Sequence, residues 1–184
     1  MIRQAVILCG DGPADFGRPI ALLPVGGAPF LDVLLFEIAR HGVTRVLLAA
    51  GAAAQGLADY AASTPLRARF GLDIEVCLDG TIERVRNRLD DMFFVLDGGS
   101  WFDINLLDLA CVLVRHPAAS AAAAVRAGAA AAADRGRSAR FGERPGDEFR
   151  RTGIYACRRA LIDKLDPLAS LDREVFPVLA RDET

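Results

Sequence analysis

The chain has 184 residues, of which 52% are hydrophobic and 25% are charged, with a net charge of −2. This length is sufficient for one domain with a hydrophobic core, and the composition excludes a disordered chain. A weakly acidic chain offers no basic stripe to a nucleic-acid backbone, and no uninterrupted apolar run is long enough to cross a bilayer.

Cysteine usage points to a reducing compartment. The four cysteines lie in apolar stretches and form no Cys-x-x-Cys pair: Cys9, Cys77, Cys111 and Cys157. This pattern is typical of reduced core thiols rather than a disulfide framework or a zinc site. The N-terminus enters a strand-like run without the pattern of a signal peptide. We therefore expect a cytoplasmic protein, not attached to a membrane, with a single domain over residues 1–184.

Short apolar runs alternate with helical patterns along the first two thirds of the chain. In chain order, the sequence predicts a strand at 4–10, a loop at 11–19, a helix at 31–42, a strand at 43–51, a short helix at 57–63, a strand at 72–80, a helix at 81–91, a strand at 92–99 and a helix at 104–116. Near-continuous apolar strands separated by helices predict an α/β fold: a Rossmann-like mixed, mostly parallel sheet with helices on both faces.

The remaining chain is less regular. Residues 118–134 are alanine-rich, which favours a helix by propensity, although a strand is also compatible with the pattern. This segment could serve a dimer interface or simply pack in the core. Residues 148–159 predict a strand, and residues 170–180 predict a helix that begins at Ser170.

Two loops follow predicted strands at the edge where α/β folds bind ligands. The first, Gly10-Asp11-Gly12, is either a phosphate cradle built from backbone N–H groups or an ordinary turn. A Rossmann dehydrogenase is disfavoured, because the next helix begins only after Pro29 and the second strand ends without an acidic residue.

The second loop contains Asp97, Trp101 and Asp103. Carboxylates at the end of a strand are suitable Mg²⁺ ligands, but Asp103 also precedes a helix and could simply cap it. Trp101 could stack on a base or a sugar, or it could close the edge of the core.

Seven segments follow one another in a recognisable order: residues 4–10, 21–51, 68–76, 93–109, 141–145, 152–157 and 170–180. In this order they resemble the sugar-1-phosphate nucleotidyltransferases, and most closely the branch that acts on mannose-, heptose- or muramic-type sugar phosphates. The resemblance implies a reaction of a nucleoside triphosphate with a sugar-1-phosphate, giving a nucleotide-sugar and pyrophosphate with the help of Mg²⁺. It also places the reaction product among the precursors of polysaccharide biosynthesis.

The resemblance implies roles for matching positions. Those expected near the nucleotide are Gly10, Asp11, Gly12, Arg18, Gly80 and Thr81, and those expected near the sugar phosphate are Gly99, Trp101, Glu143 and Arg144.

The charged groups of the family site are nevertheless missing. Ile20 stands where the family has its phosphate-binding Lys, Gly99 stands where it has its metal-binding Asp, and the glycine loop lacks the family Arg, with Arg18 only after it. The segment that carries the second metal-binding Asp in the family is not found before Thr184. Asp97 lies two residues before Gly99, which on an extended strand is about 6–7 Å away, too far to replace that Asp without movement.

Removing one preorganised charge from such a site typically slows a reaction about 10²–10³-fold. The losses therefore favour an inactive relative that has no cofactor and retains binding of a nucleotide or nucleotide-sugar, or that acts as a subunit with another copy or an active homologue. Two alternatives stay open. One is an active, diverged enzyme that uses Asp97, Asp103 or Asp11 as its Mg²⁺ ligand and Arg18 for the phosphates. The other is an interaction module without a ligand.

Overall fold

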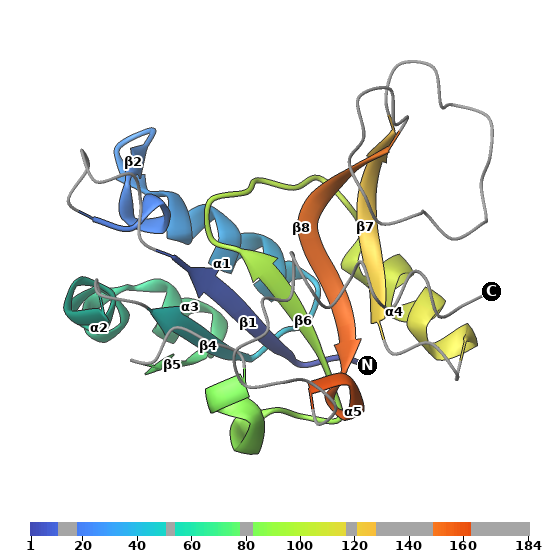
Figure 1. Ribbon diagram of the computed structural model, residues 1–184. Coiled ribbons are helices and arrows are strands. Elements are labelled where there is room, and N and C mark those ends of the chain that lie inside the picture. The colour runs from blue at the N-terminus through green and yellow to red at the C-terminus, as the bar shows by residue number, and fades with distance from the viewer. Residues whose placement is uncertain (11–17, 51–53, 78–82, 117–120, 128–148, 163–184) are drawn as a thin grey trace.

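A six-stranded sheet forms the centre of the computed structural model, which describes residues 1–10, 18–50, 54–77, 83–116, 121–127 and 149–162 (Figure 1). The strands, in their order across the sheet, are β5 (Asp73–Cys77), β4 (Arg45–Ala50), β1 (Gln4–Cys9), β6 (Met92–Asp97), β8 (Phe149–Arg158) and β7 (Ala121–Ala127). Strands β5, β4, β1 and β6 run parallel, whereas β8 is antiparallel to both β6 and β7. The prediction of a mixed, mostly parallel sheet is confirmed.

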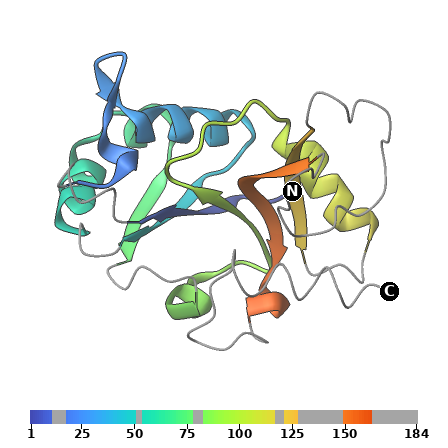
Figure 2. The same ribbon diagram turned by 45° about the horizontal axis from the view of Figure 1, so that its top comes forward.

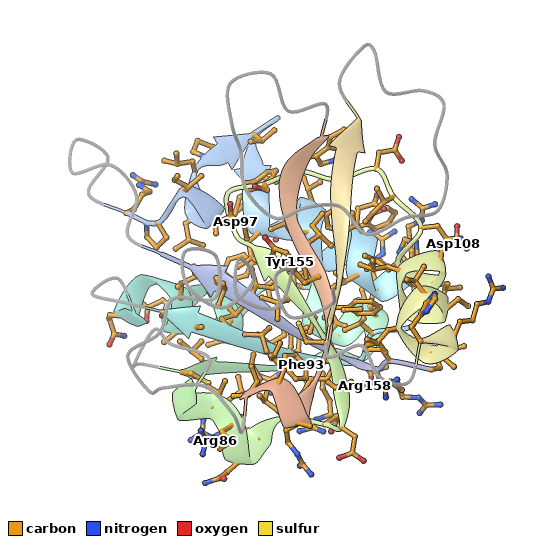
Figure 3. The ribbon with its side chains drawn as sticks, turned by 45° about the vertical axis from the view of Figure 1, so that its right-hand side comes forward. Arg86, Phe93, Asp97, Asp108, Tyr155 and Arg158 are labelled. Atoms are coloured by element: carbon orange, nitrogen blue, oxygen red, sulfur yellow. The ribbon has the colours of Figure 1, made fainter. Side chains whose placement is uncertain are left out.

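The strands are near-continuous apolar runs because both faces of the sheet are buried. Phe93 and Phe94 illustrate this in β6: successive side chains point to opposite faces, so each ring enters a different core cluster. Figure 3 labels Phe93 among the side chains of one of these clusters. Such strands lack the apolar–polar alternation of a half-exposed sheet.

Helices cover the two faces unequally (Figure 2). In the described part of the chain, one face packs against four α-helices, and the other packs against one 3-10 helix and one short α-helix. The first group is α1 (Phe30–Arg40), α2 (Ala54–Ser63), α3 (Leu66–Phe70) and α4 (Leu106–Arg115), and the second is η3 (Glu83–Arg88) and α5 (Arg159–Ile162). None of the helices in the described ranges is long and apolar enough to span a membrane.

Two expected elements differ from the structure. The helix expected at 81–91 is a 3-10 helix, η3, although its apolar positions Val85 and Leu89 are buried as the spacing required. Within 118–134, the described residues form strand β7, so local helix propensity is overridden there by pairing with β8. The helix expected at 170–180 lies outside the described residues.

The cysteines are all free, and three of them are buried. Cys111 is the exception: it lies on the exposed side of α4. The expectation that every cysteine is a core thiol is therefore wrong for Cys111.

Candidate functional site

The order of the strands locates a candidate site. After β1 the chain builds β4 and β5 on one side of it, and then returns to add β6 on the other side. In open α/β sheets, ligands bind at the carboxyl ends of the strands where the chain changes side. Here that position is the end of β1, followed by Gly10, together with the end of β6 at Asp97, and Leu8 pairs with Asp97 across the two strands.

The turn after β6 folds over the end of β1. The Gly98 N–H donates to the Leu8 carbonyl oxygen at 2.9 Å. A Cβ at position 98 would lie 2.9 Å from that same oxygen and 3.4 Å from the Ala21 Cβ. Only glycine allows this approach, so Gly98 sets the path of the loop.

Asp97 holds this turn with both of its carboxylate oxygens. Oδ1 accepts from the Gly99 N–H at 3.0 Å, and Oδ2 accepts from the Ser100 hydroxyl at 2.8 Å. Figure 3 shows Asp97 near the centre of the molecule, where β6 ends. The bond from the Gly99 N–H is the usual way in which Asp stabilises a tight turn, and the bond from the Ser100 hydroxyl adds to it.

Strand β8 approaches the same turn from the other side. Gly153 has a φ of +74°, and a Cβ there would lie 2.8 Å from the Asp97 Cβ and 3.5 Å from the Ser100 Oγ. The positive φ and the short approach both require glycine. Gly153 belongs to the segment 152–157, which the sequence resemblance had singled out.

Ile20 and Gly99 lie against each other. Ile20, which is 39% exposed, begins the short 3-10 helix η2 (Ile20–Leu22), and its Cγ2 lies 3.3 Å from the position of a Cβ on Gly99. The positions that resemble the family's Lys and metal-binding Asp are thus neighbours. In this chain both are uncharged.

The extended strand assumed between Asp97 and position 99 is wrong, because residues 98–99 form a turn. The Asp97 Oδ1 lies 3.7 Å from the Cβ position of Gly99. The strand ends at Asp97, and the turn brings Gly99 back beside the carboxylate.

The other expected site residues fall into two groups. Arg18, Trp101 and Asp103 are described and exposed, and Trp101 is 62% exposed, so it does not close the core. Asp103 does not cap the next helix, because Asn105 accepts the capping bond from the Leu107 N–H at 3.0 Å. The remaining expected residues lie outside the described ranges: Asp11, Gly12, Gly80, Thr81, Glu143 and Arg144.

Two further polar groups lie near this edge and were not predicted. Cys9, at the end of β1, is a protonated thiol: burial, and secondarily the charge of Asp97, raise its pKa to about 12. Tyr60 of α2 donates its hydroxyl to Asp32 of α1, and burial followed by this hydrogen bond raises the pKa of Tyr60. The pairing of Tyr60 with Asp32 joins two helices, so no local sequence pattern could have indicated it.

Comparisons with known proteins agree with the sequence resemblance at the level of the fold. No protein-family model matches the chain, and no curated protein matches it either. Solved structures do match the chain. HddC from Yersinia pseudotuberculosis superposes with a TM-score of 0.72 at 14% identity, covering 96% of this chain and 86% of that one. A putative glucose-1-phosphate thymidylyltransferase from Bacillus anthracis has a TM-score of 0.72 at 16% identity, covering 93% and 77%.

The inositol-1-phosphate CTP transferase from T. maritima is similar as well, with a TM-score of 0.68 at 13% identity over 98% of this chain and 80% of that one. The chain has the fold of the sugar-1-phosphate nucleotidyltransferases. At these identities the likeness concerns the fold and does not single out one branch of these enzymes.

The sequence resemblance to these enzymes implies a Mg²⁺ ion, and the donors in the described part of the chain do not fit one. Position 99 has no side chain, and both oxygens of Asp97 already accept hydrogen bonds from the turn. Within the described residues, no group of three His, Cys, Asp or Glu side chains is arranged to hold a metal. Mg²⁺ prefers near-octahedral oxygen donors, usually with at least one carboxylate free to bind it.

Proposed function

We propose that this chain is a catalytically inactive, nucleotidyltransferase-like protein that binds a nucleotide or a nucleotide-sugar. The observation that carries the proposal is the contact between Ile20 and Gly99. The resemblance assigns the phosphate-binding cation to position 20 and a metal ligand to position 99, and both positions are uncharged in this chain. Developing charge on a transferring phosphoryl group has no counter-charge there, and this counter-charge is usually the largest catalytic contribution.

Ligand binding is supported by the topology and by the solved structures that share this fold. Gly10 follows β1 at the point where the sheet changes side, and a Cβ there would meet nothing within 4 Å. Solved neighbours include HddC with GMP-PN, a UDP-glucose pyrophosphorylase with UDP-glucose and a UTP-bound UGPase from Acinetobacter baumannii. We place the base and ribose near Gly10, Asp11, Gly12, Arg18, Gly80 and Thr81, and the sugar near Gly99, Trp101, Glu143 and Arg144.

The sequence resemblance narrows the ligand further, to nucleotide-sugars of the mannose, heptose or muramic type. Trp101 supports a sugar at this edge, because an exposed indole face is a good surface for stacking on a sugar ring.

The first test combines turnover with ligand-induced stabilisation. We expect no pyrophosphate release from any of the four nucleoside triphosphates with a panel of sugar-1-phosphates. We expect one nucleotide or nucleotide-sugar to raise the Tm, equally in Mg²⁺ and in EDTA. A ligand at 100 times its Kd adds about 2.7 kcal/mol, which is a shift of about 5–10 °C for a chain of this size. If no ligand raises the Tm, the binding proposal is wrong and an interaction module is favoured.

An active, diverged enzyme is the second candidate, and one observation favours it. The Asp97 carboxylate lies only 3.7 Å from the Cβ position of residue 99, so a small rearrangement of the turn would offer it to a metal. Pyrophosphate release that requires Mg²⁺ and is lost in Asp97→Asn would establish this candidate and refute the inactive one.

A gain-of-function variant tests the missing charges directly. Ile20→Lys with Gly99→Asp restores the two family charges, and the lysine relieves the contact with the new side chain at 99. The introduced carboxylate and that of Asp97 would then share one edge, an arrangement that attracts a divalent cation. We expect a Mn²⁺-dependent rise in Tm in this variant and none in the matched Ile20→Lys/Gly99→Asn control.

A further inference from the structure

Helix α4 has an apolar outer side that the described part of the molecule does not cover. Its inner side is buried against the sheet through Leu106, Leu109, Ala110 and Leu113. On the outer side, Leu107 is 39% exposed, Val114 is 55% exposed and Cys111 is exposed. These three residues, spaced by four and three, form one stripe along the helix, which we call the α4 seam.

Two opposite charges flank the α4 seam. Asp108 lies in the first turn and Arg115 in the last, seven residues apart, so both lie on the same side of the helix. Figure 3 shows Asp108 on the outer side of α4. Neither side chain forms an ion pair within the described part of the chain.

The pattern of the seam and its charges is self-complementary in one direction only. The midpoint between Leu107 and Val114 lies within one residue of Cys111. The midpoint between Asp108 and Arg115 does so as well. Two antiparallel copies of α4 that cross at Cys111 therefore place Leu107 opposite Val114 of the other copy and Asp108 beside Arg115 of the other copy, twice. In parallel copies the charges of the two helices would lie on opposite sides of the contact, and neither pair would form.

We propose that two copies of this chain associate through the α4 seam, antiparallel, with Cys111 at the two-fold axis. A contact made by one three-turn helix is at the low end of interface sizes, so the dimer is weak, with a Kd in the micromolar range. The proposal depends on α4 alone and is independent of the nucleotide site.

Cys111 allows the first test without any mutation. Cys9, Cys77 and Cys157 are buried, so a short bismaleimide added to the native protein reports on Cys111. We expect a covalent species at twice the chain mass of 19.7 kDa. Cys111→Ser removes this product, but its dimer in sedimentation equilibrium is retained.

Charge reversal tests the direction of packing. Asp108→Arg and Arg115→Asp each replace two attractive pairs with repulsive ones, and we expect each to weaken dimerisation about tenfold or more. The double variant Asp108→Arg/Arg115→Asp recovers the pairs in exchanged order, so its Kd returns to within about threefold of the original. The matched control Asp73→Arg, at the start of β5 on the other edge of the sheet, leaves the Kd unchanged.

Each of three results overturns the proposal. The protein could remain monomeric at about 100 μM, well above the micromolar range. It could form a dimer whose Kd ignores both charge reversals. Alternatively, native Cys111 could fail to cross-link, which would show that another part of the chain or another partner covers the seam. Circular dichroism of each variant verifies that the exposed substitutions leave the fold intact.

Discussion

At the scale of single residues, Asp97 has a structural role, so a substitution there does not report on catalysis alone. Both carboxylate oxygens accept hydrogen bonds from the turn that follows β6. Asp97→Ala would release Gly99 and Ser100 together, so loss of a function in that variant could come from a misplaced loop. Asp97→Asn keeps an acceptor for the Gly99 N–H while it removes the charge, and it is therefore the informative substitution.

Gly153 gives a stability prediction with an internal control. Gly153→Ala combines a strained positive φ with a Cβ only 2.8 Å from the Asp97 Cβ. Gly71 has a similar φ of +62°, but a Cβ there meets nothing within 4 Å. We expect Gly71→Ala to cost about 1–2 kcal/mol from backbone strain, and Gly153→Ala to cost about 1–3 kcal/mol more from the close approach.

Urea unfolding of the two variants and the unsubstituted chain measures this difference. Equal losses in both variants would mean that β8 can withdraw from the Asp97 turn at little cost, and that the turn is less tightly held than its geometry indicates.

At the scale of the elements, a buried amide connects the start of β1 to the start of β6. The Gln4 Nε2 donates to the Arg88 carbonyl oxygen at 2.7 Å, and its Oε1 accepts from the Asp90 N–H at 2.6 Å. The side chain is fully buried. It therefore satisfies the carbonyl of the last residue of η3 and an N–H group of the loop before β6.

Gln4→Met keeps the approximate volume but removes both hydrogen bonds. We expect a loss of about 2–5 kcal/mol in the free energy of unfolding, because each buried backbone group left without a partner costs about 1–3 kcal/mol. Gln55→Met on the exposed side of α2 removes only a surface bond to Asp59 and should cost less than about 0.5 kcal/mol. A loss below about 1 kcal/mol at Gln4 would mean that water replaces the amide.

The elements also show how far the sequence could be interpreted. Strands β1, β4 and β6 were predictable because buried parallel strands are continuous apolar runs, and α1 and α4 were predictable from their helical spacing. The hairpin β2 (Pro24–Val25) to β3 (Ala28–Pro29) was missed, although the pair Gly26-Gly27 is a turn signal. Helix α3 was missed because five residues are too few for a periodic pattern to emerge.

The candidate site was only partly predictable for a different reason. That Asp97 and Gly10 would lie at the ligand edge followed from their places at strand ends. The contact of Ile20 with Gly99, and the return of Gly99 to the Asp97 carboxylate, depend on turn geometry and on the packing of η2, which local sequence does not encode.

At the scale of the whole molecule, buried thiols couple stability to pH. Burial raises the pKa of Cys157 to about 12, and Cys9 is raised to about 12 as well, from an ordinary value of 9.0. Both thiols ionise in the unfolded chain before they do in the folded one. Their contribution to stability is therefore intact below about pH 9 and is lost as the pH rises toward 12, by about 1.4 kcal/mol per pH unit for each thiol.

Urea unfolding of the reduced protein at intervals between pH 7 and about 10.5 tests this coupling. Above pH 9 we expect the stability of Cys157→Ala to fall less steeply than that of the unsubstituted chain. Val95→Ala is the control, since it shortens a buried side chain that does not ionise, and its slope should match the unsubstituted chain. Identical slopes in all three proteins would contradict the raised pKa of Cys157.

The central position of β1 has a consequence for synthesis on the ribosome. β1 precedes every other strand described here, yet one of its two neighbours in the sheet, β6, begins only at Met92. Until then, one edge of the apolar strand β1 has no hydrogen-bonding partner in the nascent chain. Pairing between strands so far apart in the sequence is intrinsically slow. Truncated or stalled chains that end before residue 92 should therefore aggregate or recruit chaperones, whereas chains that extend past β8 should not.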